Sequence, residues 1–199
     1  MQLTLAGLIS MLLIALLVDH FSETVDLRFS ILGYIPFLQQ ILFGLGAGII
    51  IAILIRLVIT TPLLNPVNLH YANMLGRFNL NTSEIIFVSF CAGVSEEIFF
   101  RGALQPLLGI IATAILFVAI HGYIKPSDWR LSLYGLLTIF NMTVIGYMAN
   151  TFGLISAILA HTIIDIYLFY HLQRTALTIP ISENQKLPND FEEENEEEF

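Results

Sequence analysis

Charged side chains are scarce in this 199-residue sequence. Asp, Glu, Lys and Arg make up 12% of it, whereas 56% of its residues are hydrophobic. A soluble domain carries about a quarter charged residues. One soluble core cannot hide this much Leu, Ile and Phe. The scarcity therefore argues against an ordinary soluble globular protein and favours the lipid bilayer as the solvent.

Cysteine and clustered basic residues are also nearly absent. Cys91 is the only cysteine, which excludes an intrachain disulfide, and its apolar surroundings predict a buried, inert thiol. Lys and Arg number only eight and form no basic patch, so we expect no nucleic-acid partner. The net charge of −8 is misleading, because seven of the sixteen acidic residues fall in the last ten positions. We expect 174–199 to be a disordered, acidic, cytoplasmic tail.

Long apolar runs predict an all-α membrane bundle of about six transmembrane helices with a polar intramembrane cavity. Residues 1–18 are expected to be a retained span, because they lack a basic n-region and a small-residue cleavage site. A second span is expected at about 35–59, followed by a connection that holds a short interfacial helix. Three glycines in the second span favour close helix approach, namely Gly44, Gly46 and Gly48.

Four further helices are expected after this connection. Asn81 with Glu84 three residues later is an N-cap pattern that predicts a helix start near Thr82. The helix after it is short for a span, so we expect it to start below the membrane surface or to continue its predecessor around a kink. The four helices are expected at about 82–109, 110–123, 131–149 and 154–172.

The distribution of basic residues predicts the orientation in the membrane. Six spans put both termini on the side that collects most of the basic residues, and Arg28 alone on the other. The positive-inside rule then places both termini in the cytoplasm. We expect a multi-pass protein of a bacterial-type plasma membrane, with membrane lipids as its surroundings. We divide the chain into an N-terminal part (1–81), a four-helix core (82–173) and the tail (174–199). The collected basic residues are Arg56, Arg77, Lys125, Arg130, Arg174 and Lys186.

A few ionisable residues lie inside the expected spans. Each costs from roughly 2.5 kcal/mol upward at the bilayer centre, so such residues pair, face water or react. Glu97 and Arg101 are four apart on one helix and predict a charge-assisted ion pair. Glu96 points about 100° away around the helix, so the same arginine need not neutralise it. The full set is Glu96, Glu97, Arg101, His121, His161 and Asp165.

The remaining polar residues point to activation of water. His161 and Asp165 share one helix face, and lipid leaves the polar faces of three helices no place but a common cavity. A carboxylate and a neutral imidazole together hold a water and take its proton. The second histidine and its partner then supply hydrogen bonds to an oxyanion. This constellation predicts hydrolysis of an amide or ester without a nucleophilic side chain.

Three motifs in this order resemble one known family. "EEIFFR" matches E-E-x-x-x-R, "FVAIH" matches F-x-x-x-H and "HTIID" matches H-x-x-x-[N/D]. Together, over about 82–171, they are similar to the CPBP or Abi family of CAAX prenyl proteases and bacteriocin-processing enzymes. The resemblance implies an intramembrane glutamic endopeptidase that acts on a peptide or protein substrate, prenylated or not. It implies water activation by Glu96 and His121, an oxyanion hole from His161 and Asp165, and a structural role for Glu97 and Arg101.

Asp165 departs from the pattern, because many members of this family carry Asn there. An ionised Asp cannot donate to an oxyanion, so Asp165 is either protonated or orients His161 through its ring N–H, and we favour orientation. We expect no cofactor, with metal left open, because Glu96, His121, His161 and Asp165 are also suitable zinc ligands. No H-E-x-x-H pair is present, however. A non-enzymatic carrier or adaptor is the other alternative, although a carrier is expected to show paired, similar halves and this sequence shows none.

Overall fold

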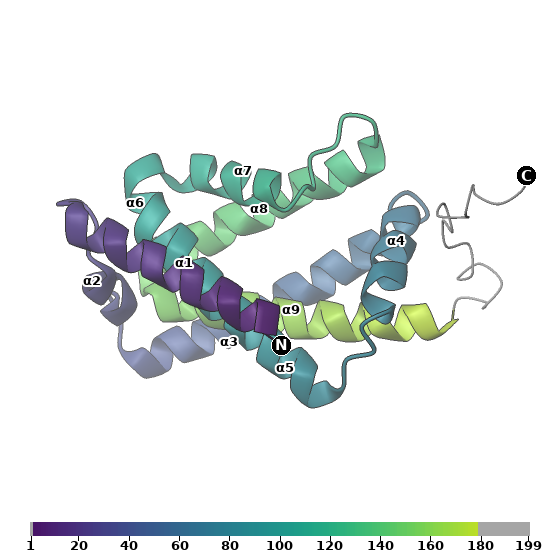
Figure 1. Ribbon diagram of the computed structural model, residues 1–199, viewed down its shortest axis with the longest axis horizontal. Coiled ribbons are helices and arrows are strands. Elements are labelled where there is room, and N and C mark those ends of the chain that lie inside the picture. Colours follow the sequence, from purple (N-terminus) through teal and green to yellow (C-terminus); the bar gives the residue numbers. More distant parts are fainter. Residues whose placement is uncertain (1, 179–199) are drawn as a thin grey trace, which may run out of the picture.

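The computed structural model describes residues 2–178, in which every regular element is a helix (Figure 1). This confirms the expected all-α membrane bundle. Helix α9 continues past the expected core boundary at 173, and the rest of the predicted tail lies outside the described residues. The elements are α1 (Gln2–Phe21), α2 (Leu27–Leu32), α3 (Phe37–Ile59), α4 (Asn65–Gly76), α5 (Thr82–Glu97), the π-helix η1 (Ile98–Leu104), α6 (Gln105–Leu108), α7 (Ile110–Ile120), α8 (Trp129–Phe152) and α9 (Leu154–Thr178).

Four of the described helices are long and apolar enough to cross a membrane: α1, α3, α8 and α9. In α1 only 6% of the apolar window is buried by protein, so lipid must cover most of this helix. The other two expected spans are built differently. Helices α5, η1 and α6 follow one another without a break, whereas α7 has 11 residues, about 16 Å. Gly109, with φ +82°, turns the chain between α6 and α7. This agrees with the expectation of a short helix that follows a kink.

The short helices and the loops that connect the long helices lie at two ends of the bundle. Figure 1 shows α4 and the loop between α7 and α8 at one end, with α2 and α6 at the other. Arg77 directly follows α4, Arg56 lies in the last turn of α3 and Arg130 in the first turn of α8, whereas Arg28 is in α2. This arrangement agrees with the expected charge bias, while the orientation in the membrane stays a prediction.

The start of α5 is set by a capping box. The Asn81 side chain accepts a hydrogen bond from the Glu84 backbone N–H at 3.0 Å, and Glu84 Oε2 accepts one from the Asn81 N–H at 2.8 Å. Two N–H groups that the first turn cannot satisfy are thereby paired. The predicted start at Thr82 is confirmed. Because the cap fixes where the helix begins, it also fixes the depth of Glu96 and Glu97 at its other end.

The helix widens directly after the two glutamates. Residues Ile98–Leu104 form a π-helix, a feature that often occurs inside α-helices at functional sites. The segment ends just before Pro106, whose ring has no N–H and clashes with the carbonyl of the preceding turn of a regular helix. The π-helix contains Arg101 and the fully buried Phe100. It therefore places Arg101 beside Glu97, and no pattern in the sequence predicted it.

Glycines bring α3 against α9, as two of the three predicted positions required. A Cβ built at Gly48 would lie 2.9 Å from the Ala160 carbonyl oxygen, and one at Gly44 would lie 2.7 Å from that of Ser156. At Gly46 nothing lies within 4 Å. The prediction was wrong for Gly46, because a residue two positions further on points to the opposite side of a helix. The contact holds α9, which carries His161, in place.

We expect Gly48→Leu to destabilise the protein, because the new side chain must push apart two helices that touch through their backbones. Overpacking of this kind costs about 1–3 kcal/mol. Gly46→Leu adds the same side chain on the same helix where space is open, and serves as the control. The measurement is the free energy of unfolding of both variants in detergent micelles. Equal stability of the two variants would contradict the close contact.

Candidate active site

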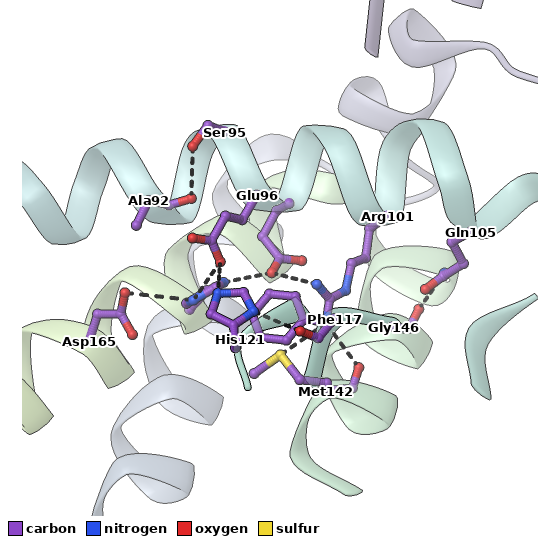
Figure 2. Close-up of polar contacts among 12 residues, drawn as sticks. Ala92, Ser95, Glu96, Arg101, Gln105, Phe117, His121, Met142, Gly146 and Asp165 are labelled. Atoms are coloured by element: carbon purple, nitrogen blue, oxygen red, sulfur yellow. Dashed lines mark hydrogen bonds and ion pairs between the residues drawn. The ribbon is translucent and has the colours of Figure 1, made fainter. Parts of the chain in front are cut away.

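The structure brings Glu96, His121, His161 and Asp165 together from three parts of the chain (Figure 2). Glu96 lies in α5, His121 directly follows α7, and both other residues lie in α9. Glu96 Oε2 is 3.7 Å from His121 Nε2 and 3.8 Å from His161 Nε2. Asp165 Oδ2 is 3.6 Å from His161 Nε2. These groups face a common space without direct hydrogen bonds between them.

A buried ion pair lies beside this group. Arg101 Nη1 is 3.1 Å from Glu97 Oε1, and their side chains are 1% and 0% exposed. Arg101 Nη2 also donates to the Met142 carbonyl oxygen at 3.3 Å, and its guanidinium lies 5.1 Å from the centre of the Phe117 ring. The pair predicted from the i, i+4 spacing is therefore formed, and through Arg101 it joins η1 to α7 and α8.

The orientation of the His121 ring follows from its hydrogen bond. Its Nδ1 lies 2.7 Å from the Phe117 carbonyl oxygen, which accepts and cannot donate. Nδ1 must therefore carry the proton, and in the neutral ring Nε2 is a free acceptor directed toward Glu96. The Phe117 ring stacks on the imidazole at 4.2 Å between centroids. The F-x-x-x-H motif thus supplies both the carbonyl and the ring that hold His121.

Glu97, rather than Asp165, makes the hydrogen bond to His161. His161 Nδ1 donates to Glu97 Oε1 at 2.7 Å, whereas Asp165 lies beyond hydrogen-bonding distance of the other ring nitrogen. The orienting role that we expected of Asp165 is therefore filled by Glu97 in this geometry. The sequence did not reveal this, because Glu97 was already assigned to Arg101. A single carboxylate oxygen serves both partners.

A cavity of about 250 Å³ holds the four predicted residues. Helices α3, α5, α7, α8 and α9 contribute to its wall, together with the loop after α7. Sequence reasoning missed the contribution of α8, although its polar residues at i, i+4 and i+7 were a readable signal. The missed polar lining residues are Tyr123, Tyr134, Thr138 and Asn141.

Ser95 and Cys91 have the packing roles that were expected of them. Ser95 Oγ donates to the Cys91 carbonyl oxygen at 2.8 Å, as a helix-packing hydroxyl does, and Cys91 is buried. Within residues 2–178, no group of three or more His, Cys, Asp or Glu is arranged to hold a metal ion. The side chains of Glu96, His121, His161 and Asp165 are nonetheless suitable zinc ligands, so zinc stays an alternative that an experiment must test.

We expect Arg101→Met to lower the free energy of unfolding by about 3–5 kcal/mol, because it leaves the Glu97 carboxylate buried without its partner. Adding Glu97→Gln to this variant should recover part of the loss, since no buried charge is then left uncompensated. Arg77→Met removes an exposed arginine and should change stability by less than about 0.5 kcal/mol. Unfolding in mixed micelles measures all three. An Arg101→Met variant as stable as Arg77→Met would contradict the structural importance of the pair.

One sequence comparison returned a match. Residues 78–167 match the model of the family described as "Type II CAAX prenyl endopeptidase Rce1-like". Searches of curated proteins and of solved structures gave no match. The matched range nearly coincides with the 82–171 over which the three motifs resemble CAAX proteases, and it contains Glu96, His121, His161 and Asp165. The resemblance to the CAAX protease family is confirmed, and residues 78–167 of this chain are similar to the Rce1-like type II CAAX prenyl endopeptidases.

Proposed function

We propose that this protein is an intramembrane endopeptidase that hydrolyses a peptide bond with a water molecule activated by Glu96 and His121. The separation of 3.7 Å between Glu96 Oε2 and His121 Nε2 carries the proposal. It is too long for a direct hydrogen bond, and both atoms accept when the glutamate is ionised and the histidine neutral. A water between them donates one hydrogen to each.

In this proposal the proton follows a simple path. The water oxygen attacks the carbonyl carbon of the scissile bond, and Glu96 takes the proton that the water loses. The same carboxyl group then gives this proton to the leaving nitrogen as the carbon–nitrogen bond breaks. His121 holds the water in place by accepting its other hydrogen at Nε2. Glu96 is 16% exposed, so water reaches it, whereas Glu97 is fully buried.

His161 is the proposed donor to the carbonyl oxygen as that oxygen becomes negative. Its Nδ1–H is committed to Glu97, so only Nε2 faces the cavity, and it donates when the ring is protonated. In its ionised form Asp165, 3.6 Å from this nitrogen, favours the protonated ring. Asp165 thus acts on His161 through its charge rather than through a hydrogen bond.

The proposed substrate is a peptide or protein that reaches the site at the membrane. An apolar cavity of about 240 Å³ between α3 and α8 adjoins the site and shares four lining residues with it: Ile55, Tyr134, Thr138 and Asn141. This surface favours a substrate with an apolar segment, such as a membrane peptide or a prenylated chain end. We propose CAAX-type ends as the first substrates to test, because the family match is to prenyl endopeptidases.

We expect Glu96→Gln to lower kcat by about 10²- to 10⁴-fold, because the amide cannot take the proton from water. The assay is cleavage of prenylated and unprenylated C-terminal peptides by the purified full-length protein in detergent. Glu23→Gln, at an exposed position outside the site, should retain wild-type activity. Equal cleavage by wild type and Glu96→Gln would contradict the role of Glu96.

The same assay separates metal-free hydrolysis from the zinc alternative. We expect a strong chelator to leave the rate unchanged, because the proposed mechanism activates water through a carboxylate and an imidazole alone. Loss of activity in the chelator and its return with Zn²⁺ would instead favour a metalloprotease built on the same side chains. No cleavage of any peptide would favour the carrier or adaptor alternative.

We also propose that both termini and the loop between α7 and α8 face the cytoplasm, because the basic residues gather at that end. In a Cys91→Ala background, Ser127→Cys should react with an impermeant maleimide only in inverted vesicles. Glu23→Cys, at the opposite end, should react in intact cells. Both positions are exposed. The reverse labelling pattern would overturn the orientation.

A further inference from the structure

Asn141 is a polar residue in the cavity that the proposed mechanism does not use. It lies in α8, a helix long and apolar enough to cross a membrane, and it lines the space that holds Glu96, His161 and Asp165. No hydrogen bond to its side chain is found within residues 2–178. Its side chain is half-buried, so its amide is free to meet a ligand in the cavity, and a polar residue at this depth of a membrane helix is a candidate functional residue.

The cavity has many acceptors and few free donors. Glu96 and Asp165 accept when ionised, and the Nδ1–H of His121 is bound to the Phe117 carbonyl oxygen. The Thr138 hydroxyl donates to the Tyr134 carbonyl oxygen at 2.9 Å. Hydrolysis of an amide places negative charge on the carbonyl oxygen, which needs donors in a dry site. The side-chain donors left in the cavity are a protonated His161, the phenol O–H groups of Tyr123 and Tyr134, and the amide of Asn141.

The amide is held on a rigid part of the structure. The next residue, Met142, accepts from Arg101 Nη2 through its carbonyl oxygen at 3.3 Å and contacts the same nitrogen through Sδ at 3.0 Å. Figure 2 shows Arg101 reaching Met142 from the helix that carries Glu96. Met142 is buried, so the backbone around Asn141 is fixed to the ion pair. A donor placed in advance is what stabilises a transition state most effectively.

Asp165 makes such a donor necessary. An ionised carboxylate beside His161 repels an oxyanion, whereas the amide of Asn141, on another helix, attracts it without adding charge. We propose that Asn141 is a catalytic residue whose Nδ2–H donates a hydrogen bond to the oxyanion of the tetrahedral intermediate, alongside His161. This rests on the proposed function. No bond to Asn141 forms or breaks, and the proton still passes from water through Glu96 to the leaving nitrogen.

The test is kinetic and uses full-length protein in detergent with the peptide that the wild type cleaves. Asn141→Ala should lower kcat by about 10²- to 10³-fold, the usual effect of losing one oxyanion donor. Its KM should stay within about threefold, because the bond strengthens in the transition state. Asn141→Leu, which fills the same space without a donor, should show the same loss.

A second substitution distinguishes this role from a structural one. Asp165→Asn offers an amide in the same cavity without charge, so combined with Asn141→Ala it should restore kcat at least about tenfold. A merely structural Asn141 would show no such rescue. Wild-type kcat in Asn141→Ala and Asn141→Leu, or an equal loss with and without Asp165→Asn, would overturn the proposal.

The Glu96→Gln variant separates failure of this inference from failure of the proposed function. If wild type cleaves, Glu96→Gln does not, and Asn141→Ala is unimpaired, the proposed function stands and the role of Asn141 falls. If wild type and Glu96→Gln behave alike, both fall together.

Discussion

The site depends on one buried ion pair. Glu97 and Arg101 are almost fully removed from solvent. In such buried surroundings neither charge is tolerated without the other. Glu97 accepts from His161 of α9, while Arg101 donates to Met142 of α8 and lies over the Phe117 ring of α7. Four separate stretches of helix are thus held by two side chains. Charge-assisted contacts are strongest where the surroundings are apolar. Apolar surroundings therefore strengthen the contacts that Glu97 and Arg101 make with each other and with the neighbouring helices.

The neighbouring glutamate has the opposite environment, and its position explains the difference. Glu96 and Glu97 are adjacent in sequence but point in directions about 100° apart, so one enters the ion pair and the other enters the cavity. Glu96 keeps access to water and lies near two imidazoles without bonding to either. Glu97 is held in the ion pair, whereas Glu96 stays available for the proposed chemistry.

The fold gives this chemistry a suitable place. The short α7 ends at Ile120, so His121 stands directly after a helix and beside a loop rather than in the middle of a span. The cavity reaches from there to the apolar space between α3 and α8. The proposed hydrolysis of a membrane-associated peptide needs access to water and an apolar surface. Glu96, which is 16% exposed, and the apolar cavity would supply these.

The sequence by itself determined the helices, the start of α5 at Thr82, the Glu97–Arg101 pair and the four residues that share the cavity. The first three depend on spacing within one helix or on a cap, and such local patterns do not need the rest of the chain. The shared cavity was expected because lipid leaves the polar faces of three helices no other place. The tertiary structure decided that Glu97 holds His161, that Gly46 faces away from α9, that the helix widens at η1, and that α8 brings Asn141 to the site. Spacing tells which residues share a face, but only the packing of whole helices decides which faces meet.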